Sequence, residues 1–329
     1  MSLAKVFREN PNRRYIMFGG KGGLGKTTFS AATGYWLAKQ GKKVLVFSVD
    51  PQASLSDIFQ RDIYGKGAVE IMPNLYAQEI DADQHIREYQ DEIRQKIRDM
   101  YGFEKIPDEI ESYIQAASAE PAMEESAIFD QVVDIVVAGG YDYYIYDLVP
   151  LGHALYYLSM ASVYDQWISK ITKLREEMRE YEQMAARVSR KKETQEDLIL
   201  KELQDIRYRI STSSSILTDR EKTAFFFVLI PEEMILIDTQ KASKLFERYQ
   251  VPISGYIVNR VIPERVVKSE HAPAYLKNRY EMQKKYLKKI HEMFGDSVLA
   301  EIEEMERDIT GLEMIERMAH AMFGEETLE

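Results

Sequence analysis

Short apolar runs alternate along this chain with longer stretches in which apolar and charged residues recur at helical spacing. The runs contain four to seven residues and are rich in β-branched and aromatic types. Such runs, bounded by turn or acidic residues, are typical of buried parallel strands. The pattern predicts an α/β fold with a doubly wound, mostly parallel sheet. The clearest strands are expected at 15–18, 44–47, 143–146, 224–230 and 255–258, with weaker candidates at 75–80 and 297–302.

Two longer stretches differ from simple crossover helices. In the first, apolar residues fall at helical spacing after Asp81 and Gln84, which are placed to cap a helix start. These apolar residues are Ile86, Tyr89, Ile93 and Ile97, and a further helical region is expected near 106–117. In the second stretch, 159–217, apolar residues recur at alternating spacings of four and three. That spacing predicts two charged helices folded against each other around 189–197.

The two stretches together predict one inserted α-helical subdomain on one side of the sheet. We expect it to comprise residues 85–125 and 159–219. The remaining segments, 1–84, 126–158 and 220–329, are expected to form the sheet domain.

Composition narrows the function classes. The net charge of −11, spread along 329 residues, argues against a general nucleic-acid surface. Because the chain has no cysteine, disulfides, thiolate zinc sites and iron–sulfur ligation are excluded. The longest apolar run, 224–230, is far shorter than the roughly 20 residues of a membrane helix. With no secretory signal pattern either, we expect a cytoplasmic protein without an integral membrane span.

The strongest chemical signal lies directly after the first predicted strand. Residues 19–28 read GGKGGLGKTT, in which Gly20, Gly25, Lys26 and Thr27 satisfy the phosphate-loop pattern G-x-x-x-x-G-K-[ST]. Glycines allow a tight turn whose backbone N–H groups face phosphate oxygens, and the following helix adds its N-terminal dipole. Lys26 is expected to neutralise the β and γ phosphates, and the Thr27 hydroxyl to hold Mg²⁺. The remaining expected nucleotide contacts in this loop are Gly22, Gly23 and Thr28.

Lys21, directly after Gly20, is a second lysine in this loop. A lysine on the outer rim of a phosphate loop can reach a phosphate bound by a second subunit and act there like an arginine finger. This spacing predicts a homodimer with face-to-face subunits. A solvated loop lysine is the alternative.

Several further segments resemble one family. SVDPQASLSDIF at 48–59, YDLVPLGHAL at 146–155 and IVNRVIP at 257–263 follow the loop in order, with FVLIPEE at 227–233 and MQKKYL at 282–287. The chain resembles the arsenite-pump (ArsA-type) and guided-entry tail-anchored-protein-targeting ATPases, which carry a deviant Walker A loop. This resemblance implies a P-loop NTPase (SIMIBI-like) fold and a Mg²⁺-dependent ATPase.

The resemblance also implies roles for individual residues. Asp50 would be the switch I carboxylate that orients or polarises the attacking water, making Asp50, Lys21 and Lys26 the catalytic set. Asp147 would hold Mg²⁺ with Thr27, usually through water. Asn259 would contact adenine, and Pro263 would shape the loop that follows. For Asp50 taken alone, a carboxylate that caps the next turn is the alternative.

The chain departs from the family pattern at several positions. Leu148 and Leu151 replace threonines of switch II, which bears on full turnover. Switch II is completed by Gly152 and His153, and we favour a structural or switch role for this histidine. The targeting branch often holds zinc through a Cys-x-x-Cys pair where this chain has residues 273–276, so no zinc site is expected and a dimer must be held by protein contacts or by ATP.

Three ATPase functions compete, and a non-enzymatic scaffold that only binds nucleotide is the remaining class because of Leu148 and Leu151. The first is an ATP-driven homodimer whose helical subdomain opens and closes around a protein client, such as a membrane-protein segment. Met160, Met178 and Met184 could line a groove for it, although packing between two helices explains them more simply. The second is the energy subunit of an anion or metalloid pump, which the lack of cysteine disfavours. The third is a partition-type positional ATPase, which needs a DNA face or a membrane tail; the apolar face of 311–323 is more consistent with packing on the sheet.

Overall fold

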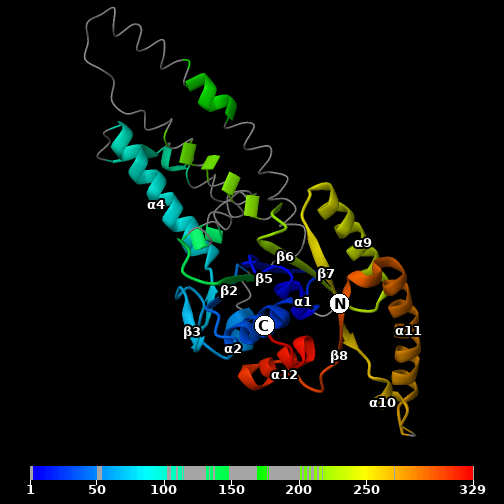
Figure 1. Ribbon diagram of the computed structural model, residues 1–329. Coiled ribbons are helices and arrows are strands. Elements are labelled where there is room, and N and C mark those ends of the chain that lie inside the picture. The colour runs from blue at the N-terminus through cyan, green and yellow to red at the C-terminus, as the bar shows by residue number, and fades with distance from the viewer. Residues whose placement is uncertain are drawn as a thin grey trace, which may run out of the picture.

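A β-sheet forms the centre of the part of the chain that the structure describes. The computed structural model describes residues 3–49, 54–101, 138–147, 218–269 and 271–328 continuously, with parts of 105–114, 131–135, 169–177 and 201–216. Within these residues, eight strands form one sheet in the order β3-β4-β2-β5-β1-β6-β7-β8 (Figure 1). The strands are β1 (Tyr15–Gly19), β2 (Val44–Ser48), β3 (Val69–Met72), β4 (Leu75–Glu79), β5 (Tyr143–Asp147), β6 (Thr223–Leu229), β7 (Ile253–Val261) and β8 (Val298–Glu303).

The predicted α/β fold with a mostly parallel sheet is confirmed. Each predicted strand is present within a few residues of its expected bounds. β3 was not predicted, and it pairs antiparallel with β4 at one edge of the sheet. All other neighbouring strands are parallel. The antiparallel edge strand therefore extends a parallel sheet whose carboxyl ends share one edge.

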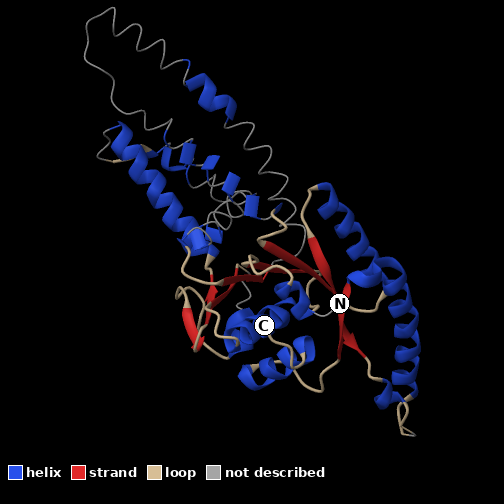
Figure 2. Cartoon of the chain, viewed as in Figure 1, coloured by secondary structure: helices blue, strands red, loops and turns tan. Residues whose placement is uncertain are grey.

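Helices lie on both faces of the sheet (Figure 2). They are α1 (Leu3–Arg8), α2 (Lys26–Lys39), α3 (Ser54–Phe59), α4 (Ala82–Tyr101), α9 (Glu233–Arg248), α10 (Glu264–Val267), α11 (Ala274–Phe294) and α12 (Gly311–Phe323), with a 3₁₀ turn, η1, at Gly295–Ser297. The contacts of strand β6 show which helices cover each face of the sheet. Phe225 and Phe227 contact Phe246 of α9, whereas Phe226 contacts Phe7 of α1. Because successive strand residues point to opposite faces, α9 and α1 cover opposite sides of the sheet.

The two ends of the described chain meet on α2. Phe7 of α1 packs against Trp36 of α2 and Phe323 of α12, and the rings of Trp36 and Phe323 stack with centroids 4.1 Å apart. Tyr35 donates to Glu316 at 2.7 Å. The apolar face of 311–323 is buried as expected, but it lies mainly against α2 and only partly against β8. The expectation that this helix packs on the sheet holds at β8, and α2 provides the larger part of its contact.

Helix α4 projects away from the sheet (Figure 1). Its start is capped as predicted, because the backbone N–H of Gln84 donates to Asp81 Oδ1 at 3.0 Å. Farther along, Arg94 forms ion pairs with Asp91 and Glu111. Within the described residues, no helix is long and apolar enough to cross a membrane. The division into a sheet domain and an inserted helical subdomain stays a prediction.

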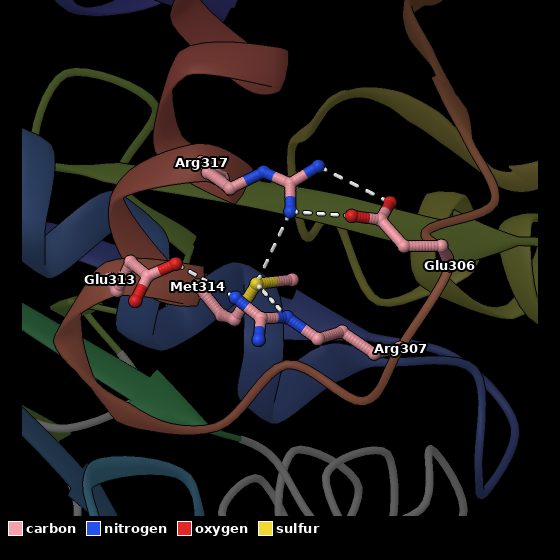
Figure 3. A network of polar contacts seen from close by, with 5 residues as sticks. All are labelled: Glu306, Arg307, Glu313, Met314 and Arg317. Atoms are coloured by element: carbon pink, nitrogen blue, oxygen red, sulfur yellow. Dashed lines mark hydrogen bonds and ion pairs between the residues drawn. The ribbon is translucent and has the colours of Figure 1, made fainter.

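The turn between β8 and α12 is held by a polar network (Figure 3). Arg317 binds Glu306 through two nitrogen–oxygen contacts of 2.6 and 3.2 Å. Arg307 donates to Glu313 at 2.7 Å and to the sulfur of Met314 at 3.0 Å. The hydrogen bonds from Arg317 and from the backbone lower the pKa of Glu306 from its ordinary 4.5 to about 2. A carboxylate whose pKa is lowered by folding stabilises the folded state at every pH above its pKa in the unfolded chain. This contribution is lost as the pH falls toward 2.

We expect Arg317→Met to lower the midpoint of thermal unfolding slightly at pH 7, because the ion pair is exposed to solvent. The difference from wild type should shrink between pH 4.5 and about 2, as Glu306 becomes protonated. Thermal unfolding followed by circular dichroism across this pH range checks it. In a Glu306→Gln background, Arg317→Met should lower the midpoint of thermal unfolding much less than it does in wild type. An equal difference at pH 7 and near pH 2 would contradict the assigned pairing.

Candidate active site

The loop after β1 lies at the point where the sheet's connections diverge. β1 pairs with β5 on one side and with β6 on the other. The carboxyl ends of β2 and β5 are in register there, with Ser48 opposite Asp147. Ligands of doubly wound sheets bind outside the carboxyl ends of the strands at such a switch point. The chain thus places the glycine-rich loop where this fold binds its ligands.

Two glycines of this loop occupy positions that other residues cannot adopt without strain. Gly20 has φ +153°, and a Cβ on it would lie 2.5 Å from the carbonyl oxygen of Val228 in β6. Gly25 has φ +97°, and a Cβ on it would lie 2.8 Å from Nδ2 of Asn259. Both positive φ values and both close approaches require glycine. The pattern G-x-x-x-x-G is therefore explained by the backbone and by the neighbours β6 and β7.

Helix α2 begins directly at the end of the loop. Gly25 is its N-cap, no side chain of the described residues caps this end, and Phe29 N–H donates to the Gly25 carbonyl at 3.0 Å. The N–H groups of the first turn thus face the loop together with the positive end of the helix dipole. Lys26, Thr27 and Thr28 are half-buried in this turn. Lys26 Nζ lies 3.4 Å from the carbonyl oxygen of Lys21, so the lysine side chain bends back along the loop.

Asp147, at the end of β5, is a buried carboxylate beside this turn. It is only 3% exposed, and Ser30 Oγ donates to its Oδ1 at 3.4 Å. Ser30 lies one turn after Thr27, so the contact brings Asp147 to the side of α2 that faces the sheet. Sequence reasoning selected Asp147 and missed Ser30. A hydroxyl three residues after the loop threonine, on the face turned to the strands, was the signal that could have found it.

Two residues near the end of β7 donate hydrogen bonds to the backbone of the loop. Asn259 Nδ2 donates to the carbonyl of Leu24 at 2.9 Å, and Asn259 Oδ1 accepts from the backbone N–H of Arg260 at 2.9 Å. The Arg260 guanidinium donates to the carbonyl of Gly23 at 3.0 Å. Asn259 is therefore in the site, although its amide contacts the loop backbone. Pro263 lies at the start of α10. Arg260 was not predicted.

Lys21 points to a different neighbour from Lys26. Its ammonium lies 3.3 Å from Asp238 Oδ2 of α9, and both side chains are about half exposed. Asp238 was not predicted as part of the site, because it lies 217 positions from Lys21 in the sequence. The lysine on the rim of the loop is thus held by an ion pair at the surface.

Asp50 and the switch II residues Leu148, Leu151, Gly152 and His153 lie outside the described residues. So do the methionines considered for a client groove, Met160, Met178 and Met184. The described segment that follows Asp50 is anchored by a buried carboxylate. Glu79, at the end of β4, accepts from the backbone N–H of Leu55 at 2.5 Å and from the hydroxyl of Ser56, at the start of α3. This anchor fixes where the chain leaves the Asp50 loop.

Comparison with known proteins identifies the family. A family model described as anion-transporting ATPase matches residues 13–324, almost the whole chain. The chain belongs to this family. The family resemblance drawn from the motifs is confirmed, and with it the expectation of an ATPase. Within the described residues, no cluster of three or more His, Cys, Asp or Glu could hold a metal ion.

Curated relatives include two named as arsenical pump-driving ATPases and one named as a GET3-type ATPase. The chain is 32% identical over 329 residues to "Putative arsenical pump-driving ATPase 1" of Aquifex aeolicus, covering 95% of this chain and 79% of that protein. It is 31% identical over 308 residues to "Putative arsenical pump-driving ATPase 2" of the same organism, covering 93% and 98%. It is also 30% identical over 272 residues to "ATPase GET3C" of Arabidopsis thaliana, covering 77% and 68%. ATPase is common to all three names.

Proposed function

We propose that this anion-transporting ATPase family member works as a homodimer that binds Mg·ATP in the glycine-rich loop and hydrolyses it with help from Lys21 of the opposite subunit. One observation carries the proposal. Lys21 lies on the exposed rim of the loop and contacts Asp238 of α9, whereas Lys26 bends back along the loop within its own subunit. An exposed cation on the rim is placed to meet a phosphate presented by a second copy.

Lys26 and the amides of the loop would bind the phosphates. The N–H groups around Gly25 and the first turn of α2 form a set of donors, and Lys26 adds a point charge at its edge. Lys21 of the other subunit would approach from the rim after leaving Asp238. Because charge develops on the transferred phosphoryl group, donors fixed before the reaction stabilise the transition state more than the ground state.

The residues present fit a magnesium ion. Thr27 offers a hydroxyl, and Asp147 offers a buried carboxylate bonded to Ser30, and both are hard oxygen ligands. Magnesium commonly takes only one or two protein ligands and completes its shell with water and substrate phosphates. When bound, the ion would neutralise charge on the β and γ phosphates. Asp50 would orient the attacking water and accept its proton.

We further propose that nucleotide state opens and closes the helical segments that project from the sheet, and that they hold a protein client. Helix α4 leaves the sheet directly after β4, whose last residue, Glu79, also anchors α3. A movement of the Asp50 loop would therefore be transmitted through α3 and Glu79 to the base of α4. If a single apolar helix fused to a carrier is not captured by the Mg·ATP form, the client half of the proposal fails and the ATPase half stands.

A pump-driving role is the second candidate, because the names of the two Aquifex relatives favour it. Soft metalloids such as arsenite are held by thiolates, and this sequence has no cysteine. Stimulation of turnover by arsenite or antimonite would favour this candidate over the client-binding one.

Lys21→Ala tests the homodimer directly. We expect turnover to fall roughly 10- to 100-fold, because one preorganised cation is removed from the transition state. The dissociation constant for Mg·ADP should stay within about threefold of wild type, since the subunit's own cradle is intact. Turnover per subunit should also rise with protein concentration for wild type, and this dependence should be lost in the variant. Steady-state kinetics and calorimetry measure these quantities.

Asp238→Asn is the matched control. It removes the ion-pair partner of Lys21 while keeping the lysine. Turnover should not fall in this variant. Unchanged turnover in Lys21→Ala would remove the cross-subunit lysine from the account.

A further inference from the structure

Arg260 occupies a backbone conformation that its residue type rarely adopts. Its φ is +54°, in the left-handed region, within strand β7. The pairing of β7 with β8 shifts register between Val258 and Val261, so Arg260 lies in an irregularity of the ladder. Bulges of this kind re-aim side chains next to active sites, and strained residues persist where surrounding contacts over-determine them.

Two buried amides hold this conformation. Asn259 Oδ1 accepts from the backbone N–H of Arg260 at 2.9 Å. Gln283 of α11, only 4% exposed, donates to the carbonyl of Arg260 at 2.9 Å and accepts from Ile262 N–H at 2.9 Å. Both polar groups of the Arg260 backbone are therefore satisfied outside the strand ladder. The exposed guanidinium is directed at the loop by a framework that is itself buried.

The guanidinium and the neighbouring amide fix two successive peptide groups of the loop. Arg260 donates to the carbonyl of Gly23 at 3.0 Å, and Asn259 donates to the carbonyl of Leu24 at 2.9 Å. A trans peptide group is planar, and its C=O and the following N–H point in opposite directions. Holding the carbonyl of Gly23 toward β7 therefore turns the N–H of Leu24 away from β7. In the same way, the hydrogen bond from Asn259 holds the carbonyl of Leu24 toward β7 and so turns the N–H of Gly25 away from β7.

We propose that Arg260 is a positioning residue for nucleotide binding: by holding the Gly23 carbonyl it orients the Leu24 amide toward the phosphates. This inference rests on the proposed phosphate site at residues 20–28. Glycine-rich loops are free to rotate their peptide groups, so an unheld loop would lose donors to other orientations. An external clamp limits that freedom before the ligand arrives. A charged donor suits this task, because hydrogen bonds from ionised groups are stronger than neutral ones.

The test compares Arg260→Gly, Arg260→Ala and Arg260→Lys by calorimetric titration with Mg·ADP and with magnesium pyrophosphate. Arg260→Gly removes the clamp while glycine accepts the positive φ, so it should unfold at or near the wild-type temperature and bind both ligands roughly tenfold more weakly. Arg260→Ala should bind as weakly and unfold at a lower temperature than the glycine variant. Arg260→Lys keeps a cationic donor and should bind within about threefold of wild type.

Each outcome of these titrations supports or refutes the positioning role of Arg260. Equal losses for Mg·ADP and magnesium pyrophosphate, with rescue by lysine, would support the positioning role. Wild-type affinity of Arg260→Gly for pyrophosphate would overturn it, and so would a loss confined to Mg·ADP, because that places Arg260 on the nucleoside. If wild type itself takes up neither ligand, the phosphate site fails and this inference fails with it. Binding by wild type that is retained in the glycine variant refutes only the role of Arg260.

Discussion

Asp50→Asn should reduce ATP turnover by about 10³-fold while leaving Mg·ATP bound, the range expected when a general base is lost. The amide has nearly the shape of the carboxylate but cannot accept the proton of the attacking water. Asp50 follows β2, whose end at Ser48 lies in register with Asp147. The chain therefore enters the Asp50 loop at the edge of the sheet where the γ-phosphate is proposed to lie. Steady-state turnover and equilibrium Mg·ATP binding, measured on the same preparation, separate catalysis from affinity.

Asp57→Asn is the matched control for this substitution. Asp57 is an exposed carboxylate of α3, in the segment that follows the same loop. The variant should turn over ATP at the wild-type rate. Equal rates for wild type and Asp50→Asn would leave Asp50 without a catalytic role.

Gly25→Ala is expected to weaken Mg·ADP binding by about 100-fold or more, since strain and displacement of a neighbour act together. The alanine would be forced to φ +97°, and its Cβ would lie 2.8 Å from Asn259 Nδ2. Either the loop or Asn259 must move, and Asn259 holds the carbonyl of Leu24. The N–H groups at the start of α2 would then lose their alignment. Calorimetric titration with Mg·ADP measures the loss.

Gly41→Ala separates backbone strain from damage to the site. Gly41 has φ +76° in the turn after α2, and a Cβ on it would meet no atom of the described part of the chain within 4 Å. This variant should lose some thermal stability and keep wild-type affinity for Mg·ADP. If both alanine variants bind Mg·ADP as wild type does, the loop around Gly25 is not the phosphate site.

The sheet was predictable because its central strands are buried on both faces. Such strands have to be apolar throughout, and β6 is fully buried from Thr223 to Leu229. β3 escaped prediction because it has four residues, alternates in burial and includes the exposed Glu70. Helix α1 escaped because six residues show too little periodicity, although Phe7 is central to the packing between α2 and α12.

The site was predictable only as far as one segment carries it. The loop at 20–28 could be found because its chemistry is encoded in consecutive residues. Arg260 and Asp238 could not be found in this way, since they meet the loop only through the folded sheet, from 237 and 217 positions away. The orientation of Arg260 also depends on an irregularity in β7 that no local sequence pattern predicts. Asn259 was predicted as an adenine contact. Its hydrogen bond to the carbonyl of Leu24 could not be predicted, because the two residues meet only in the folded sheet.

Mixed dimers test most directly whether two subunits build each catalytic centre. Lys21→Ala and Asp50→Asn subunits, each expected as a homodimer to turn over ATP at least about tenfold more slowly than wild type, can be coexpressed with different tags and purified as the mixed pair. One site of that pair combines an intact Asp50 with the Lys21 of its neighbour, so turnover should recover to about half of the wild-type rate. A mixed dimer as inactive as its two parents would contradict the cross-subunit role of Lys21.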